Sequence, residues 1–209
     1  FPTRRSSDLQ QGVNYAQTAE GGLDVQRQAT QRLRELAVQA SNGTLSDEQR
    51  AAINTEAQQL VEQVGDVAQD TEYNGQQVLA ENTTVDLGTE GDVAVNVNAS
   101  TPESLGIDNI DLSTAEGAAA AIDTLDTAGQ RIDQNRANLG AQVNRFETAI
   151  AQREIGVENA MAAESAIRDA DLARTVVQQT RGQLLLQGGV GAIAQSNVTP
   201  QAALNLLGG

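Results

Sequence analysis

The chain has 209 residues and a formal net charge of −15, with 39% hydrophobic residues, only 2% aromatic residues, and no histidine or cysteine. Because its basic residues are all arginines, it lacks thiol, imidazole and lysine side chains, and we expect neither an enzyme nor a metal or cofactor site. The acidic balance argues against nucleic acid as a partner, and no apolar run is long enough to predict a membrane span.

Residues 1–9 differ in character from the chain that follows them. Phe1–Leu9 corresponds, in one reading frame, to the translation of a common short-read sequencing adaptor. We therefore interpret residues 1–9 as a sequencing artefact and assign residues 10–171 to the core of the molecule. On this interpretation the native N-terminal segment is missing.

Two amphipathic helices are predicted next, at 11–41 and 46–70. Apolar residues recur at three- and four-residue spacings in both segments, which is typical of a helix that buries one face. Gly43 favours an end to the first helix, because glycine readily adopts the left-handed conformation. The segment Ser46–Gln49 has the form of a capping box and predicts the start of the second helix. A turn at 73–75 follows it.

A β-hairpin is predicted at 83–97, where β-branched residues alternate with polar ones. The acidic turn Gly88–Gly91 suggests a calcium site, but its spacing does not match an EF-hand loop. Carboxylates and glycine are common in turns, so we favour an ordinary hairpin turn there.

A long helix is predicted at 114–165. Its core positions repeat every seven residues, at Leu125, Ile132, Leu139 and Phe146. A sustained heptad seam requires partner helices, and a helix of this length spans about 75 Å. The sequence therefore predicts a mainly α fold, an elongated antiparallel rod of three long helices with one small β-hairpin.

The last part of the chain, 172–209, is predicted to be an amphipathic segment with a broad apolar surface. Thr199-Pro200 predicts the start of a separate short helix, because proline is tolerated at the first helical position. A surface this apolar requires a partner, and we expect none within the chain, although folding back on the first helix is the alternative. The apolar residues that define this surface are Leu172, Val176, Leu184, Leu185, Val190 and Ile193, together with Leu186.

Motifs near both ends resemble those of bacterial flagellins. The resemblance rests on Gln31–Gln39 and Tyr73-Asn74-Gly75 in the first half, and on Arg136–Phe146, Ser165–Ala173 and Asn197–Gln201 in the second. It covers nearly all of 11–209, in the order that the family has. It implies an antiparallel helical rod with a small hairpin beside it, without the outer variable domains of larger flagellins. It also implies that 172–209 forms a channel-lining coiled coil whose N-terminal partner helix is absent.

The resemblance also implies contact residues. Arg32, Leu36 and Glu56 occupy the positions that pack neighbouring subunits and contact the animal Toll-like flagellin receptor. From spacing alone, the alternative is that Leu36 lies in the core and the two charges form a solvated face. The six apolar residues of 172–209 carry the coiled-coil contact and the contact with an export chaperone.

The family resemblance predicts a self-assembling filament subunit for swimming motility, which is secreted through the flagellar export apparatus. Its implied partners are other flagellin subunits, the export chaperone, and the filament cap and junction proteins. A hook–filament junction protein is one alternative, and the segment Asn197–Gln201 favours flagellin over it. A non-polymerising acidic helical binding module is the other, and the predicted hairpin argues against it.

Overall fold

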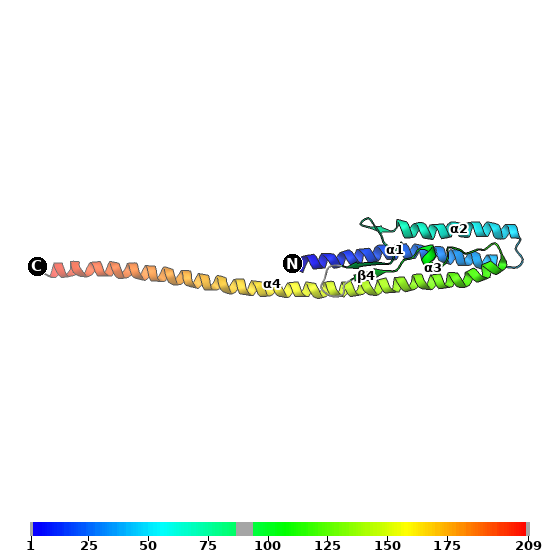
Figure 1. Cartoon of the computed structure of the whole chain (residues 1–209). Coiled ribbons are helices and arrows are strands. Elements are labelled where there is room, and N and C mark those ends of the chain that lie inside the picture. Colours follow the sequence, from blue (N-terminus) through cyan, green and yellow to red (C-terminus); the bar gives the residue numbers. More distant parts are fainter. Residues whose placement is uncertain (1, 87–93, 208–209) are drawn as a thin grey trace. The chain divides into compact units, whose positions relative to one another are not determined.

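The computed structural model describes residues 2–86 and 94–207, in two compact units at 1–154 and 155–209. The elements in chain order are α1 (Pro2–Ala40), α2 (Asp47–Asp70), β1 (Glu72–Tyr73), β2 (Gln76–Gln77), β3 (Thr83–Asp86), β4 (Ala94–Val97), α3 (Pro102–Leu105) and α4 (Ala115–Leu207). In the first unit, Figure 1 shows α1 between α2 and the first part of α4. The predicted mainly α fold with long helices is confirmed.

The helix α1 begins earlier than the sequence analysis predicted. It starts at Pro2 rather than Gln11, and Leu9, the last residue of the segment set apart as an artefact, is fully buried in the core. Arginine and leucine in this segment favour helix, so the segment continues the helical register of the residues that follow. The origin of residues 1–9 stays a prediction.

The start of α2 confirms the predicted capping box. The Ser46 hydroxyl accepts a hydrogen bond from the Gln49 backbone N–H, and the Gln49 side chain accepts one from the Ser46 N–H. Arg50, one residue further on, is 7% exposed and donates to the Ala40 and Asn42 carbonyl oxygens. Because the last carbonyls of a helix have no partner within it, Arg50 caps the end of α1 and fixes the α1–α2 corner.

Two hairpins are present among the described residues, not one. The predicted hairpin is confirmed as β3 paired with β4, with Val85 opposite Val95, and its turn at 88–91 lies outside the described residues. The additional hairpin joins β1 to β2 through Asn74 and Gly75, which have φ of 54° and 78°. Positive φ at both central residues is the requirement of a type I′ turn, which Asn-Gly satisfies best.

The helix α4 differs from the prediction at its far end. It begins at Ala115, close to the predicted 114, but continues past 165 to Leu207 without a break. The separate short helix predicted from Thr199-Pro200 is therefore wrong. The segment between the two predictions is rich in leucine, glutamine and arginine, which favour helix, and its glycines do not interrupt it.

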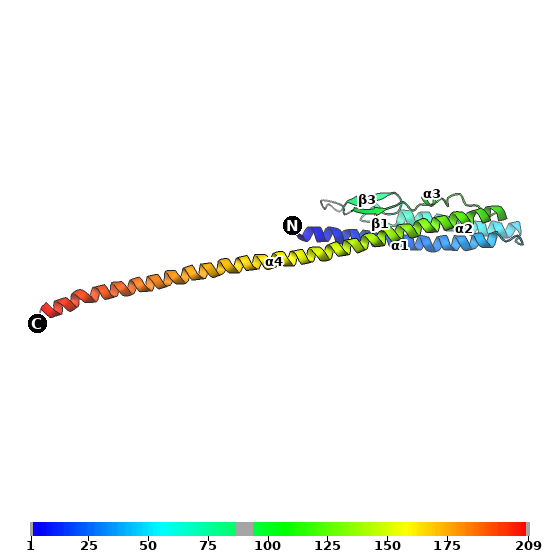
Figure 2. The same cartoon turned by 90° about the horizontal axis from the view of Figure 1, so that it is seen from below.

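The core of the first unit lies along an antiparallel seam between α1 and α4. All four predicted heptad residues of α4 are buried, and 5% is the largest exposed fraction among them. Ion pairs flank the seam: Arg27 pairs with Asp133 at 2.9 Å, and Arg136 pairs with Asp24 at 3.3 Å. Later α1 residues pair with earlier α4 residues, so the two helices run in opposite directions, as Figure 2 shows.

A buried glutamine joins three segments of the first unit. The Gln26 side chain is fully buried and its Nε2 donates to the carbonyl oxygens of Val64 (3.0 Å) and Ser100 (2.8 Å). Its Oε1 accepts a hydrogen bond from the Ser100 hydroxyl at 2.6 Å. One turn earlier, a Cβ added at Gly22 would lie 2.6 Å from the Thr71 hydroxyl, so α1 approaches the end of α2 closely there.

Gln26→Ala is expected to lower the free energy of unfolding of the first unit by about 2–4 kcal/mol, because it leaves buried polar groups of two segments unsatisfied. Gln28→Ala is the matched control, since Gln28 is exposed on the same helix. Urea unfolding followed by circular dichroism measures both. Equal stabilities for the two variants would contradict the role given to Gln26.

Candidate subunit-contact surfaces

The first candidate surface lies on the outer faces of α1 and α2. Arg32 donates to one carboxylate oxygen of Glu56 from Nε (3.2 Å) and Nη2 (2.8 Å), and to Glu35 from Nη1 (3.2 Å). Arg32 and Glu56 are about half exposed, so the structure brings these two predicted residues together at the surface. The hydrogen bonds to Glu56, with a smaller effect of Glu35, raise the pKa of Arg32.

Leu36 does not share this surface. Its side chain is only 1% exposed and belongs to the core of the first unit, so the prediction that it makes an intermolecular contact is not supported by its position. Arg32 and Leu36 are one helical turn apart, but helical positions four residues apart differ by about 40° around the axis. That rotation places Arg32 on the exposed face and Leu36 on the buried one. A core position for Leu36 was the alternative considered from spacing alone.

Two exposed apolar residues of α1 were missed by the sequence analysis. Val25 is 41% exposed and Val38 is 48% exposed on α1. Both valines fall outside the buried stripe of the helix. An apolar residue outside that stripe is the signal by which the sequence could have identified them as exposed. Val25 lies seven residues before Arg32 and therefore on nearly the same line of the helix.

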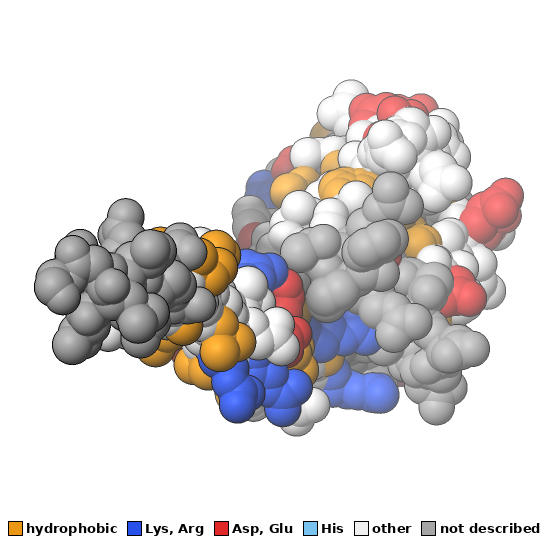
Figure 3. All heavy atoms as spheres, turned by 90° about the vertical axis from the view of Figure 1, so that its left-hand side faces the viewer, with side chains coloured by type: hydrophobic (Ala, Val, Ile, Leu, Met, Phe, Trp, Pro, Cys, Tyr) orange, Lys and Arg blue, Asp and Glu red, His pale blue; other side chains and the backbone are white. Residues whose placement is uncertain are grey.

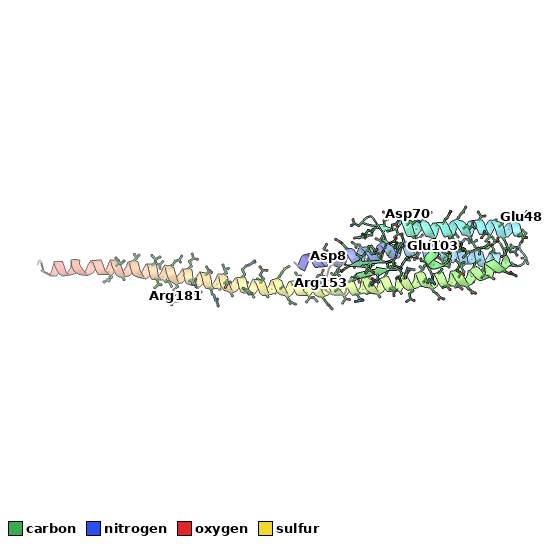
Figure 4. The ribbon with its side chains drawn as sticks, viewed as in Figure 1. Asp8, Glu48, Asp70, Glu103, Arg153 and Arg181 are labelled. Atoms are coloured by element: carbon green, nitrogen blue, oxygen red, sulfur yellow. The ribbon has the colours of Figure 1, made fainter. Side chains whose placement is uncertain are left out.

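The second candidate surface is the exposed apolar surface of α4 within the second unit. From 158 to 195 every described side chain is exposed, so this face is not buried within the described part of the chain. Hydrophobic side chains lie at the surface beside arginines in Figure 3, and Figure 4 shows Arg181 pointing outward from the helix. The six predicted residues are exposed by 52–72%: Leu172, Val176, Leu184, Leu185, Val190 and Ile193.

Further apolar residues extend the second surface beyond the prediction. Val177, beside the predicted Val176, is 65% exposed, and Leu186, which the sequence also placed on this surface, is 70% exposed. Ile167 and Met161 are exposed by 65% and 62% on the preceding turns. The surface therefore starts before Leu172, the boundary expected from the sequence.

Among the described side chains, in 7–86 and 94–195, no group of three potential metal-ligating carboxylates is arranged around one point. The suggested calcium turn at 88–91 lies outside these ranges. None of the described helices combines the length and the apolar character that crossing a membrane requires.

Comparison with known proteins identifies related sequences at both ends. The family described as "Bacterial flagellin N-terminal helical region" matches residues 4–84, and "Bacterial flagellin C-terminal helical region" matches residues 122–207. The first match starts inside the segment 1–9. The chain is 37% identical to flagellin FlaB2 of Treponema pallidum, over 97% of this chain and 78% of the relative. It is 38% identical to a flagellin of Halalkalibacterium halodurans, over 97% of this chain and 77% of that relative.

Solved structures show the same fold. The crystal structure of Bacillus cereus flagellin matches with a TM-score of 0.63 at 25% identity, over 70% of this chain and 88% of that one. A putative flagellar hook-associated protein from Vibrio parahaemolyticus matches with a TM-score of 0.60, over 76% of this chain and 89% of that one. Its identity of 11% makes that likeness one of fold alone.

Leu36→Ala is expected to lower the free energy of unfolding by about 2–5 kcal/mol, the cost of a cavity in a packed core. Val38→Ala, at an exposed position two residues away, is expected to change it by less than about 0.5 kcal/mol. Chemical unfolding of the two variants under identical conditions makes the comparison. A Leu36 variant as stable as the parent would place that side chain outside the core.

Proposed function

This chain belongs to the bacterial flagellin family, and on that basis we propose how its two exposed surfaces serve the flagellar filament. The chain is a structural subunit of that filament, which is extracellular, and it polymerises with other flagellin subunits. Flagellins are structural proteins, and we extend this to the absence of any enzymatic activity here. The proposals below concern which residues make the contacts and which other partners bind.

We propose that the second surface packs against other helices in the filament, as a coiled coil lining the channel. The observation that carries this proposal is the exposure of three consecutive leucines, Leu184, Leu185 and Leu186, by 63%, 72% and 70%. Burying each side chain would contribute about 1.5–3 kcal/mol, so assembly provides a large driving force for covering this face. The proposed coiled-coil segment is 172–209, and the core rod is 10–171.

The same face suits an export chaperone before assembly. An exposed apolar helix face is the kind of ligand that a hydrophobic groove binds, and covering it would keep unassembled copies from associating. We therefore assign the chaperone contact to the six residues of the coiled-coil segment named above. Export through the flagellar apparatus, and contact with the filament cap and junction proteins, belong to the same proposal.

We assign the first surface to contacts between subunits and to the animal Toll-like flagellin receptor, through Arg32 and Glu56. The ion pair between these two residues fixes the positions of both side chains, and about half of the surface of each side chain remains accessible to a partner. Leu36 supports this surface from the core side, by fixing the position of α1 beneath it. The exposed Val25 adds an apolar contact on the same line of the helix.

Replacing Leu184, Leu185 and Leu186 together with serine is expected to weaken chaperone binding by at least about tenfold, because apolar area is lost from the contact. Filament yield falls as well. The matched control replaces Gln178, Gln179 and Gln183 with serine, on the same exposed helix. Titration calorimetry with the export chaperone of the producing bacterium measures the first effect. Unchanged binding by the leucine variant would exclude this segment from the chaperone site.

Arg32→Ala is expected to reduce receptor signalling by at least about fivefold while leaving the fold intact, since the pair with Glu56 is exposed. Arg27→Ala is the control, because Arg27 forms a similar exposed pair with Asp133 at the α1–α4 seam. Receptor-reporter cells treated with each purified flagellin provide the measurement. Equal signalling by the two variants would remove Arg32 from the receptor contact.

A further inference from the structure

A polar groove runs between α4 and the chain segment that contains β4 and α3, and its described lining residues include no carboxylate. Its first part has a volume of about 640 Å³ and is lined by Asn96, Asn98, Asn138, Gln142 and Arg145, with two alanines. An adjoining part of about 390 Å³ shares Asn98 and adds Arg131. Neither part has an aspartate or glutamate among its described lining residues, although acidic residues outnumber basic ones 28 to 13 in the chain.

The walls of this groove are fixed by side-chain amides. Gln142 accepts a hydrogen bond from the Asn96 backbone N–H at 2.8 Å and donates to the Asn96 carbonyl oxygen at 3.1 Å. Asn98 donates to the Asn135 side chain at 2.9 Å, so β4 and the segment after it are held against α4 at two levels. The groove is therefore preformed, which lowers the entropic cost of binding a partner.

The cationic groups of the groove keep donors available. Arg131 uses Nη1 for the Ser104 carbonyl oxygen at 2.6 Å, and its other N–H groups make no further hydrogen bond to the described residues. Arg145 makes no hydrogen bond or ion pair to any described side chain or backbone group. Both residues are exposed, and a guanidinium group is suited to binding a carboxylate by two parallel hydrogen bonds.

The spacing of these groups matches an acidic line on α2. Arg131, Asn138 and Arg145 are seven residues apart on α4, and Glu48, Thr55 and Glu62 are seven apart and exposed on α2. Each line spans about 21 Å, because both lie on α-helices with the same rise per residue. Glu48 and Glu62 have no ion pair with a described residue, so both carboxylates are available to a partner.

These two lines cannot meet within one copy of the chain. Figure 1 shows α1 between α2 and α4, and Figure 4 shows Glu48 at the far end of the outer helix α2. An acidic protein repels its own copies except where a basic surface meets an acidic one. The described lining of this groove contains two arginines and no carboxylate, so the groove is such a basic surface.

We propose that this groove binds the outer face of α2 from a second copy of the chain, with Arg131 and Arg145 facing Glu48 and Glu62. The proposal rests on the role of the chain as a filament subunit and names one contact between subunits. Because the contact consists of exposed charges, it weakens as ionic strength rises.

The test is an intermolecular disulfide in filaments sheared from cells that produce the variant. Glu62→Cys combined with Arg145→Cys is expected to give cross-linked dimers and larger species on non-reducing gels after mild oxidation. The parent chain has no cysteine, so each disulfide joins introduced residues. The control pair combines Glu62→Cys with Glu147→Cys, because Glu147 is exposed on another side of α4. Filaments that form but show no Glu62–Arg145 cross-link, or equal cross-linking in the control, would overturn the proposal.

A charge exchange supplies a second measurement that does not depend on cross-linking. Arg145→Glu or Glu62→Arg alone is expected to raise the critical concentration for polymerisation by about tenfold, through repulsion across the contact. The combined variant is expected to return to within about twofold of the parent, since the pair is restored with reversed charges. Helix content measured by circular dichroism verifies that each monomer is folded. A combined variant that is at least as defective as the single variants would overturn the proposed pairing. The role of the chain as a filament subunit would still stand, because the parent chain forms filaments in the same experiment.

Discussion

The antiparallel seam between α1 and α4 is the constraint on which the rest of the first unit depends. The buried side chains of the first unit are mostly aliphatic or alanine, with almost no aromatic residues. Ion pairs at its edges, such as Arg27 with Asp133, join later residues of α1 to earlier residues of α4. Helix α2 then packs against α1, and the β3–β4 hairpin is held on α4 through Gln142 and Asn98.

Buried polar groups give the packing of the first unit its specificity. An alanine-rich interface is compatible with several helix registers, because small side chains fit one another in many ways. From α1, Gln26 satisfies polar groups of two other segments, at Val64 and Ser100, and a shift of α1 by one turn would leave these groups buried without partners. Arg50 has a similar effect at the α1–α2 corner, where it caps the carbonyl groups at the end of α1.

The two units differ in where their free energy comes from. The first unit buries its apolar residues within the chain, whereas the described side chains of the second unit from 158 to 195 remain exposed. A single helix in water is marginally stable, since most helical stability in proteins comes from packing. For a filament subunit this division is useful, because the free energy of covering the second surface becomes available on assembly.

The sequence by itself determined the helical periodicity, the heptad seam of α4, the capping box at Ser46 and the Asn-Gly turn, because each depends on residues close together in the chain. It also carried the family motifs and the apolar residues of the second surface. Only the tertiary structure decided that Leu36 is buried while Arg32, one turn away, is exposed. The physical reason is that periodicity fixes the angles between side chains on a helix but not the positions of neighbouring helices. The partners of Gln26 and the groove beside Arg145 join segments far apart in the chain, so no local pattern could reveal them.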